Sequence, residues 1–143
     1  MAFPGLHTRQ LGPGWEQTER ALADVDADFS RTMPGAPKLI LLWHDDPERE
    51  SRHAYVGKSA DWYFGAEGGF DLSSDYAQSV VDIANEVQGA VADNLLGYLW
   101  AWPLCPADGR LLSVAVKDDR ACYWVCCSSD AHVVAKVGAL GAG

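Results

Sequence analysis

The sequence has little positive charge and no long hydrophobic run. It contains 11 Lys and Arg against 20 Asp and Glu, which gives a net charge of −9 at pH 7. Because contacts to phosphate supply most of the affinity of nucleic-acid-binding proteins, we do not expect so acidic a chain to bind nucleic acid. No stretch approaches the roughly 20 apolar residues that a bilayer-crossing helix needs, so we expect no membrane span.

The first 14 residues lack a basic region followed by an apolar core. We therefore expect no secretory signal and predict a cytoplasmic protein. Residues 1–14 are rich in Gly and Pro, which predicts a flexible N-terminal arm. Residues 15–143 fit one domain, whose C-terminal part, 98–143, has the pattern of β-strands.

Signatures of common enzymes are also missing. The chain has no H-E-x-x-H sequence, no nucleophile elbow and no glycine-rich phosphate loop between a strand and a helix. The glycine-rich stretch from Gly65 to Gly69 is followed by no Lys, and Glu67 within it would repel a phosphate group. The leading interpretation is therefore a non-catalytic protein.

Two segments have the spacing of amphipathic helices. From Trp15 to about Ser30, apolar residues recur at helical spacing, and the carboxylates, Asp28 among them, are expected to face outward. A second helix is predicted from an N-cap at Ser73 or Ser74 to about Leu96, where Gly97 would end it.

Short apolar runs predict strands at 38–44, 53–56, 111–117, 121–127 and 132–137, and glycines beside aromatics at 57–72 predict a bent loop or irregular strand. The predicted fold is α+β, with two helices packed on a mostly antiparallel sheet and a C-terminal β-hairpin. A two-residue turn at Asp118 and Asp119 would place Leu111 opposite Cys126.

The second predicted helix carries a row of carboxylates. No Lys or Arg lies between Lys58 and Arg110. Four acidic side chains are expected to share one wet helical face: Asp75, Asp82, Glu86 and Asp93. Such a face attracts a basic surface, so we predict a protein-binding, accessory or immunity-like module with a basic partner. The alternative is a solvated face that only maintains solubility.

The four cysteines, Cys105, Cys122, Cys126 and Cys127, all lie in the C-terminal third. Strand alternation puts Cys122 and Cys126 on one face of their strand and Cys127 on the other. The hairpin brings four candidate zinc ligands to one end: Cys105, Asp108, Cys126 (or Cys127) and His132. The alternatives to a zinc-stabilised module are buried thiols or a disulfide such as Cys105–Cys126.

The segment from His44 to His53 contains two histidines and four carboxylates. If its flanking strands pair, His44 and His53 approach each other, which suggests a ligand-binding protein or enzyme that uses them beside an aromatic pocket. The alternative is a solvated loop. Of the six tryptophans, Trp100 and Trp102 are expected to pack where helix and sheet meet.

Three short motifs carry a resemblance: Trp102-Pro-Leu-Cys105-Pro, Trp124-Val-Cys126, and the run from His132 to Leu140. Over about 40 residues, this C-terminal segment resembles small uncharacterised proteins of high-GC bacteria. The resemblance implies a bacterial protein but no known activity. It also implies a Cys-Pro-x-His arrangement where this chain has Asp108.

Overall fold

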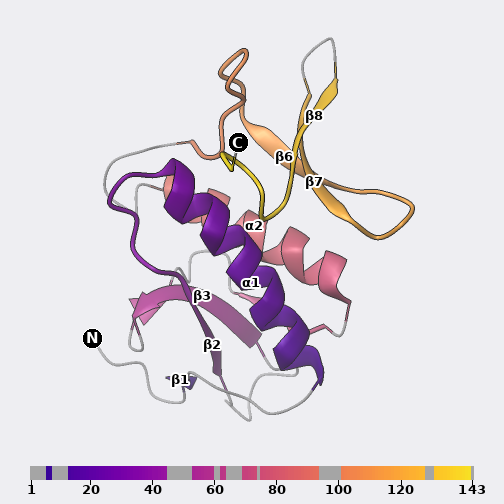
Figure 1. Ribbon diagram of the computed structural model, residues 1–143. Coiled ribbons are helices and arrows are strands. Elements are labelled where there is room, and N and C mark those ends of the chain that lie inside the picture. The colour runs from indigo at the N-terminus through magenta and orange to yellow at the C-terminus, as the bar shows by residue number, and fades with distance from the viewer. Residues whose placement is uncertain are drawn as a thin grey trace.

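Two helices lie between two antiparallel sheets in the part of the chain that the structure describes (Figure 1). This computed structural model describes residues 6–7, 13–44, 53–59, 62–63, 69–73, 75–93, 101–127 and 131–142. The predicted α+β class, with helices on antiparallel sheets and a C-terminal hairpin, is confirmed. Neither described helix has the length and apolar character to span a membrane.

Helix α1 runs from Pro13 to Thr32, slightly longer than predicted. Proline suits the first helical turn because the backbone N–H groups of that turn have no acceptor within the helix, so the N–H that proline lacks is not needed. The apolar stripe of Leu22, Val25 and Phe29 is buried, as its spacing predicts. Residues 13 and 14 therefore belong to the helix and not to an N-terminal arm.

Helix α2 runs from Tyr76 to Ala92. Its N-cap is Asp75, whose carboxylate accepts a hydrogen bond from the Ala77 N–H at 3.0 Å, so the predicted caps at Ser73 and Ser74 are wrong. The Ser73 hydroxyl instead accepts from the Asp75 N–H. The helix ends at the C-cap Asp93, earlier than predicted, and Leu96 and Gly97 lie outside the described residues.

The first sheet lies on one side of the helices and is built mainly from β2 (Ile40–His44) and β3 (His53–Ser59). Two short strands from the predicted irregular region, β4 (Trp62–Tyr63) and β5 (Phe70–Asp71), both pair with β3. Strand β1 (Leu6–His7) pairs with the end of β2. The predicted arm thus contributes a strand, which its Gly- and Pro-rich composition did not indicate.

The second sheet contains β6 (Leu112–Val116), β7 (Cys122–Cys126) and β8 (His132–Lys136) in that order. The predicted hairpin is present, but its register differs by one residue, because Leu112 and not Leu111 pairs with Cys126. The turn has three residues instead of two: Arg120 adopts a φ of 63°, and the Lys117 N–H bonds the Ala121 carbonyl. The extra residue shifts every pair of the hairpin.

Residues from both helices and both sheets form one hydrophobic core. At its centre, the Trp102 ring meets Phe29 and Trp124 edge-on, with ring centroids 5.0 and 5.4 Å apart. The Trp102 indole N–H also bonds the Thr32 hydroxyl. The predicted packing of Trp102 between helix and sheet is therefore confirmed, whereas Trp100 lies outside the described residues.

The prediction that Asp28 faces outward is wrong, because its side chain is 0% exposed. Its carboxylate accepts hydrogen bonds from the Trp124 indole N–H at 2.8 Å and from the backbone N–H groups of Gly138 at 2.7 Å and Leu140 at 2.9 Å. Arg31 lies 3.4 Å away as an ion-pair partner. Burial raises the pKa of Asp28, and these donors offset part of that cost. They also fasten β7 and the C-terminal turns to α1.

We predict that Asp28→Ala lowers the free energy of unfolding by about 3 kcal/mol or more, because it leaves several buried N–H groups without an acceptor. Asp28→Asn retains one acceptor oxygen and should give a smaller loss. Asp118→Ala, in the exposed hairpin turn, is the control and should change stability by about 0.5 kcal/mol at most. Urea denaturation measures all three, and equal losses for Asp28→Ala and Asp118→Ala would contradict the prediction.

Candidate metal centre

Three segments of the C-terminal region meet at the end of the second sheet that lies opposite the turn between β6 and β7. The Cys105 loop follows a bridge between Leu104 and Leu111, Cys126 ends β7, and His132 begins β8. Because Cys126 pairs with His132 in the sheet, the two side chains are neighbours. The sulfur atoms of Cys105 and Cys126 and a ring nitrogen of His132 all lie within 4.8 Å of one another.

The loop that presents Cys105 is closed by its own backbone. The Cys105 N–H bonds the Arg110 carbonyl at 2.7 Å, and the Gly109 N–H bonds the Cys105 carbonyl at 2.8 Å. Gly109 has a φ of +75°, a backbone conformation that side chains with a Cβ rarely adopt. The Asp108 carboxylate accepts from the Arg110 N–H at 3.0 Å, which orients it inside the same turn.

Asp108 reaches the cluster from the side of Cys126. Its two carboxylate oxygens lie 3.2 and 3.5 Å from the Cys126 sulfur, which donates to them as a thiol. On the other side, the Cys105 sulfur lies 3.6 Å from Nε2 of His132. Of the four residues that the sequence singled out as candidate zinc ligands, Cys105, Cys126 and His132 therefore form one group, and Asp108 adjoins this group at Cys126.

The loop favours negative charge at this site. Burial raises the pKa of the Cys105 thiol, but hydrogen bonds from the backbone N–H groups of Ala107 and Asp108, with those from His132 and Cys126, outweigh it and lower the pKa. The Arg110 N–H, followed by the Cys126 thiol, lowers the pKa of Asp108. A thiolate and a carboxylate are the forms that bind metals.

The site lies just beneath the surface. Cys105 and Cys126 are 2% and 0% exposed, whereas Asp108 and His132 are exposed. Two sulfurs, an imidazole and a carboxylate are ligands that zinc accepts, and sulfur excludes the hard cations Mg²⁺ and Ca²⁺. Because one side of the cluster faces solvent, an ion can enter without unfolding of the core.

The other two cysteines lie apart from the cluster. Cys122 is buried against the Ala77 carbonyl, and burial raises the pKa of its thiol. Cys127 directly follows β7 and is exposed, whereas Cys126 is buried, which agrees with the predicted alternation. The alternative ligand Cys127 is therefore less well placed than Cys126. The structure joins none of the four cysteines in a disulfide.

The predicted acidic face of α2 is not one wet surface. Glu86 is only 4% exposed, and Asp82 is half-buried, where burial raises its pKa. Asp75 caps the helix and forms an ion pair with Arg120 of the hairpin turn. Of these four residues, Asp75 and Asp93 are exposed. The prediction that Glu86 lies on a solvated face is therefore wrong, and the basic partner stays a prediction. Helical spacing alone missed this because sheets lie on two sides of α2.

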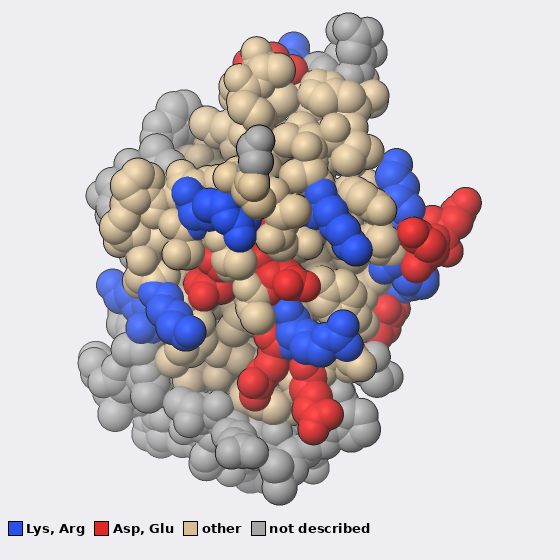
Figure 2. Space-filling view, viewed as in Figure 1, with Lys and Arg blue, Asp and Glu red and all other residues tan. Residues whose placement is uncertain are grey.

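On the face that carries α1, Lys and Arg side chains lie among Asp and Glu side chains (Figure 2). The net negative charge of the chain is therefore not expressed as a uniform surface there.

His44 and His53 end adjacent strands, as the predicted hairpin requires. The last pair between β2 and β3 joins Trp43 to Ala54, so the two histidines are the next residue of each strand. Residues 45–52, which connect them, lie outside the described residues, and the prediction of a site there stays a prediction.

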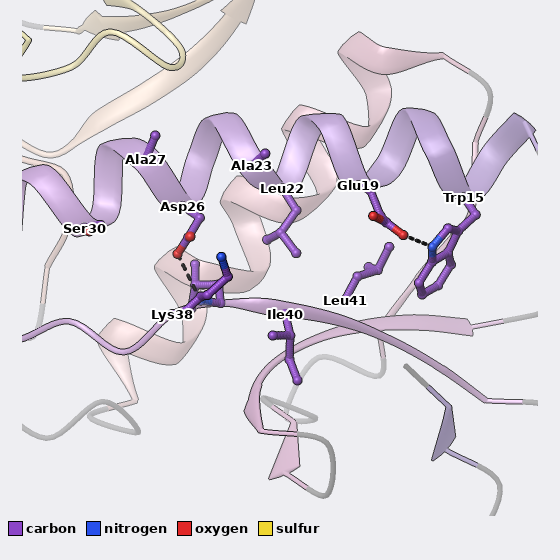
Figure 3. A pocket seen from close by; sticks show the side chains of 11 residues that line it. Trp15, Glu19, Leu22, Ala23, Asp26, Ala27, Ser30, Lys38, Ile40 and Leu41 are labelled. Atoms are coloured by element: carbon purple, nitrogen blue, oxygen red, sulfur yellow. Dashed lines mark hydrogen bonds between the residues drawn. The ribbon is translucent and has the colours of Figure 1, made fainter. Parts of the chain in front are cut away.

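A cavity of about 550 Å³ lies between α1 and β2 (Figure 3). Its acidic residues are already used to hold these elements: Glu19 accepts from the Trp15 indole, and Asp26 accepts from the Leu39 N–H at 2.9 Å. This cavity could not be predicted from the sequence, because its walls come from two elements whose separation depends on packing. Its lining holds no cysteine or histidine, in contrast to the Cys105 cluster.

We predict that Gly109→Ala loosens the Cys105 loop, because a positive φ costs an alanine about 1–2 kcal/mol. Gly35→Ala is a matched control, since Gly35 has the same φ of +75° and, like Gly109, no atom within 4 Å of an added Cβ. Both variants should lose similar stability, but only Gly109→Ala should speed hydrogen exchange of the Cys105 and Arg110 amides, whose hydrogen bonds close this loop. Exchange measured by NMR checks this, and equal rates in the two variants would refute it.

Comparisons with known proteins leave the site unassigned. No protein family, curated protein or solved structure matches the chain. What the Cys105 cluster can bind is therefore inferred from its donor atoms and the distances between them.

Proposed function

We propose that the C-terminal sheet is a zinc-stabilised module in which Cys105, Asp108, Cys126 and His132 hold the ion. The observation that carries this proposal is the convergence of two sulfurs and an imidazole nitrogen within 4.8 Å, from three separate segments. This position at the end of the sheet lets one ion join the Cys105 loop to β7 and β8.

Two distances within the cluster are close to those that zinc requires. Zn–S and Zn–N bonds of about 2.3 and 2.0–2.1 Å at a tetrahedral angle place sulfur and nitrogen about 3.6 Å apart. The Cys105 sulfur and His132 Nε2 are 3.6 Å apart. The same geometry with a Zn–O bond of about 2.0–2.2 Å requires roughly 3.5–3.7 Å between sulfur and oxygen. Cys126 and Asp108 are 3.2–3.5 Å apart, so they need only a small adjustment.

A structural role suits the place of the site in the fold. The second sheet has three strands of five residues each, and the segments at its open end are short turns and loops. Such a sheet gains stability when a metal ion cross-links its loops, because ligand binding is coupled to folding. With four protein ligands, the coordination shell of the ion is filled, as in structural zinc sites.

We expect the reduced, purified protein to contain about one zinc ion per chain. Cys105→Ser and Cys126→Ser should abolish this stoichiometric zinc, because each removes a thiolate ligand. Cys127→Ser is the matched control and should retain it, since this neighbouring thiol lies on the opposite face. Elemental analysis and the visible spectrum of the cobalt-substituted protein measure the outcome. Less than about 0.2 zinc per chain in the unmodified protein would reject the proposal.

Removal of zinc should destabilise the protein. At free zinc a thousandfold above its dissociation constant, binding stabilises the folded state by about 4 kcal/mol. We therefore expect EDTA to lower the midpoint of urea denaturation, and added zinc to restore it. Gly35→Ala, far from the ligands in sequence, should respond to EDTA as the unmodified protein does. A midpoint that EDTA leaves unchanged, in protein shown to contain zinc, would contradict a structural role.

A further inference from the structure

The two thiols of the proposed zinc site are placed to react with each other. The sulfurs of Cys105 and Cys126 come from different segments and lie within 4.8 Å. A disulfide bond is about 2.05 Å long, so its formation shortens this distance by about 2.8 Å at most. Cys105 sits on a turn of the loop, where rotation about the side chain can supply much of that movement without displacing a strand.

The other cysteines of the chain are poor competitors. Cys122 lies in the core against the Ala77 carbonyl, on the far side of Trp124 along β7. Cys127 is exposed and does not belong to the group of ligand atoms that lie within 4.8 Å of one another. Oxidation of the cluster is therefore expected to join one pair of sulfurs in preference to the others.

The surroundings of Cys105 favour attack on an oxidant. Nε2 of His132 lies 3.6 Å from its sulfur. A thiolate is the nucleophile toward peroxides, and a cysteine that binds zinc is held in this form. The exposed side chains of Asp108 and His132 mark the solvent side of the site, from which a molecule as small as hydrogen peroxide can approach.

We propose that the zinc site is a redox switch, in which hydrogen peroxide oxidises Cys105 and Cys126 to a disulfide and zinc leaves. This inference rests on the proposed zinc site. The Cys105 thiolate attacks the O–O bond, forms a sulfenic acid and releases hydroxide. The Cys126 thiolate then attacks that sulfur, forms the S–S bond and displaces a second hydroxide. Two thiolates lose two electrons, and peroxide with two protons becomes two waters.

The ligand change explains why zinc leaves. The disulfide removes two of the four ligands and leaves only Asp108 and His132. The S–S bond keeps the Cys105 loop attached to β7, whereas His132 loses its link to both. Oxidation therefore replaces the zinc ion by the S–S bond as the link between the Cys105 loop and β7. It also frees His132 at the beginning of β8, a strand that pairs only with β7 among the described strands.

The test adds hydrogen peroxide to the full-length, zinc-loaded protein and follows zinc release with a chromogenic chelator. We expect loss of about one zinc ion per disulfide formed, and recovery of zinc binding after a reductant and zinc are added. Alkylation followed by mass spectrometry without reduction should find Cys105 linked to Cys126, with Cys122 and Cys127 alkylated. Cys127→Ser should release zinc at the same rate as the unmodified protein.

The outcomes separate the two proposals. Protein that contains no zinc before oxidation would overturn the proposed function. Protein that contains zinc but keeps it in peroxide would overturn the switch alone. The same conclusion would follow if zinc left while the cysteines became sulfinic acids, or if the disulfide used Cys127. In the last case Cys127→Ser would block zinc release.

Discussion

The buried carboxylate of Asp28 joins the two halves of this fold. Through Trp124, Gly138 and Leu140 it fastens the second sheet and the C-terminal turns to α1. These hydrogen bonds and the Arg31 ion pair offset part of the cost of placing a charge inside the core. The aromatic contacts of Phe29, Trp102 and Trp124 pack beside it. The position of β7, and with it the position of Cys126, depends on this attachment.

The candidate metal centre lies along the same strand. Trp124 and Cys126 both face inward from β7, so one bonds the helix and the other joins the cluster at the open end of the sheet. The core buries alternate residues of β7, while the proposed zinc ion would join the Cys105 loop and the beginning of β8 to the end of that strand. The small size of this sheet explains why a cross-link at its open end has stability to add.

Much of the site could be predicted from the sequence because it depends on local rules. Strand alternation separates Cys126 from Cys127, and a hairpin returns the chain to the Cys105 loop. The hairpin register was predicted wrongly, because the turn takes a third residue with Arg120 at positive φ. The grouping of the ligands survived this error, since a shift of one residue moves a partner by only a few ångströms along the strand.

The carboxylates show where such rules stop. Helical spacing tells on which face of its own helix Asp28 or Glu86 lies, but not whether another element covers that face. Sheets lie on two sides of the helix pair, and both side chains are buried. By itself the sequence determined the class of fold, the C-terminal hairpin and the residue types that meet at its open end, because these follow from periodicity and chain connectivity. Only the tertiary structure decided which charges are buried and how closely the ligands approach, because both depend on contacts between segments far apart in the chain.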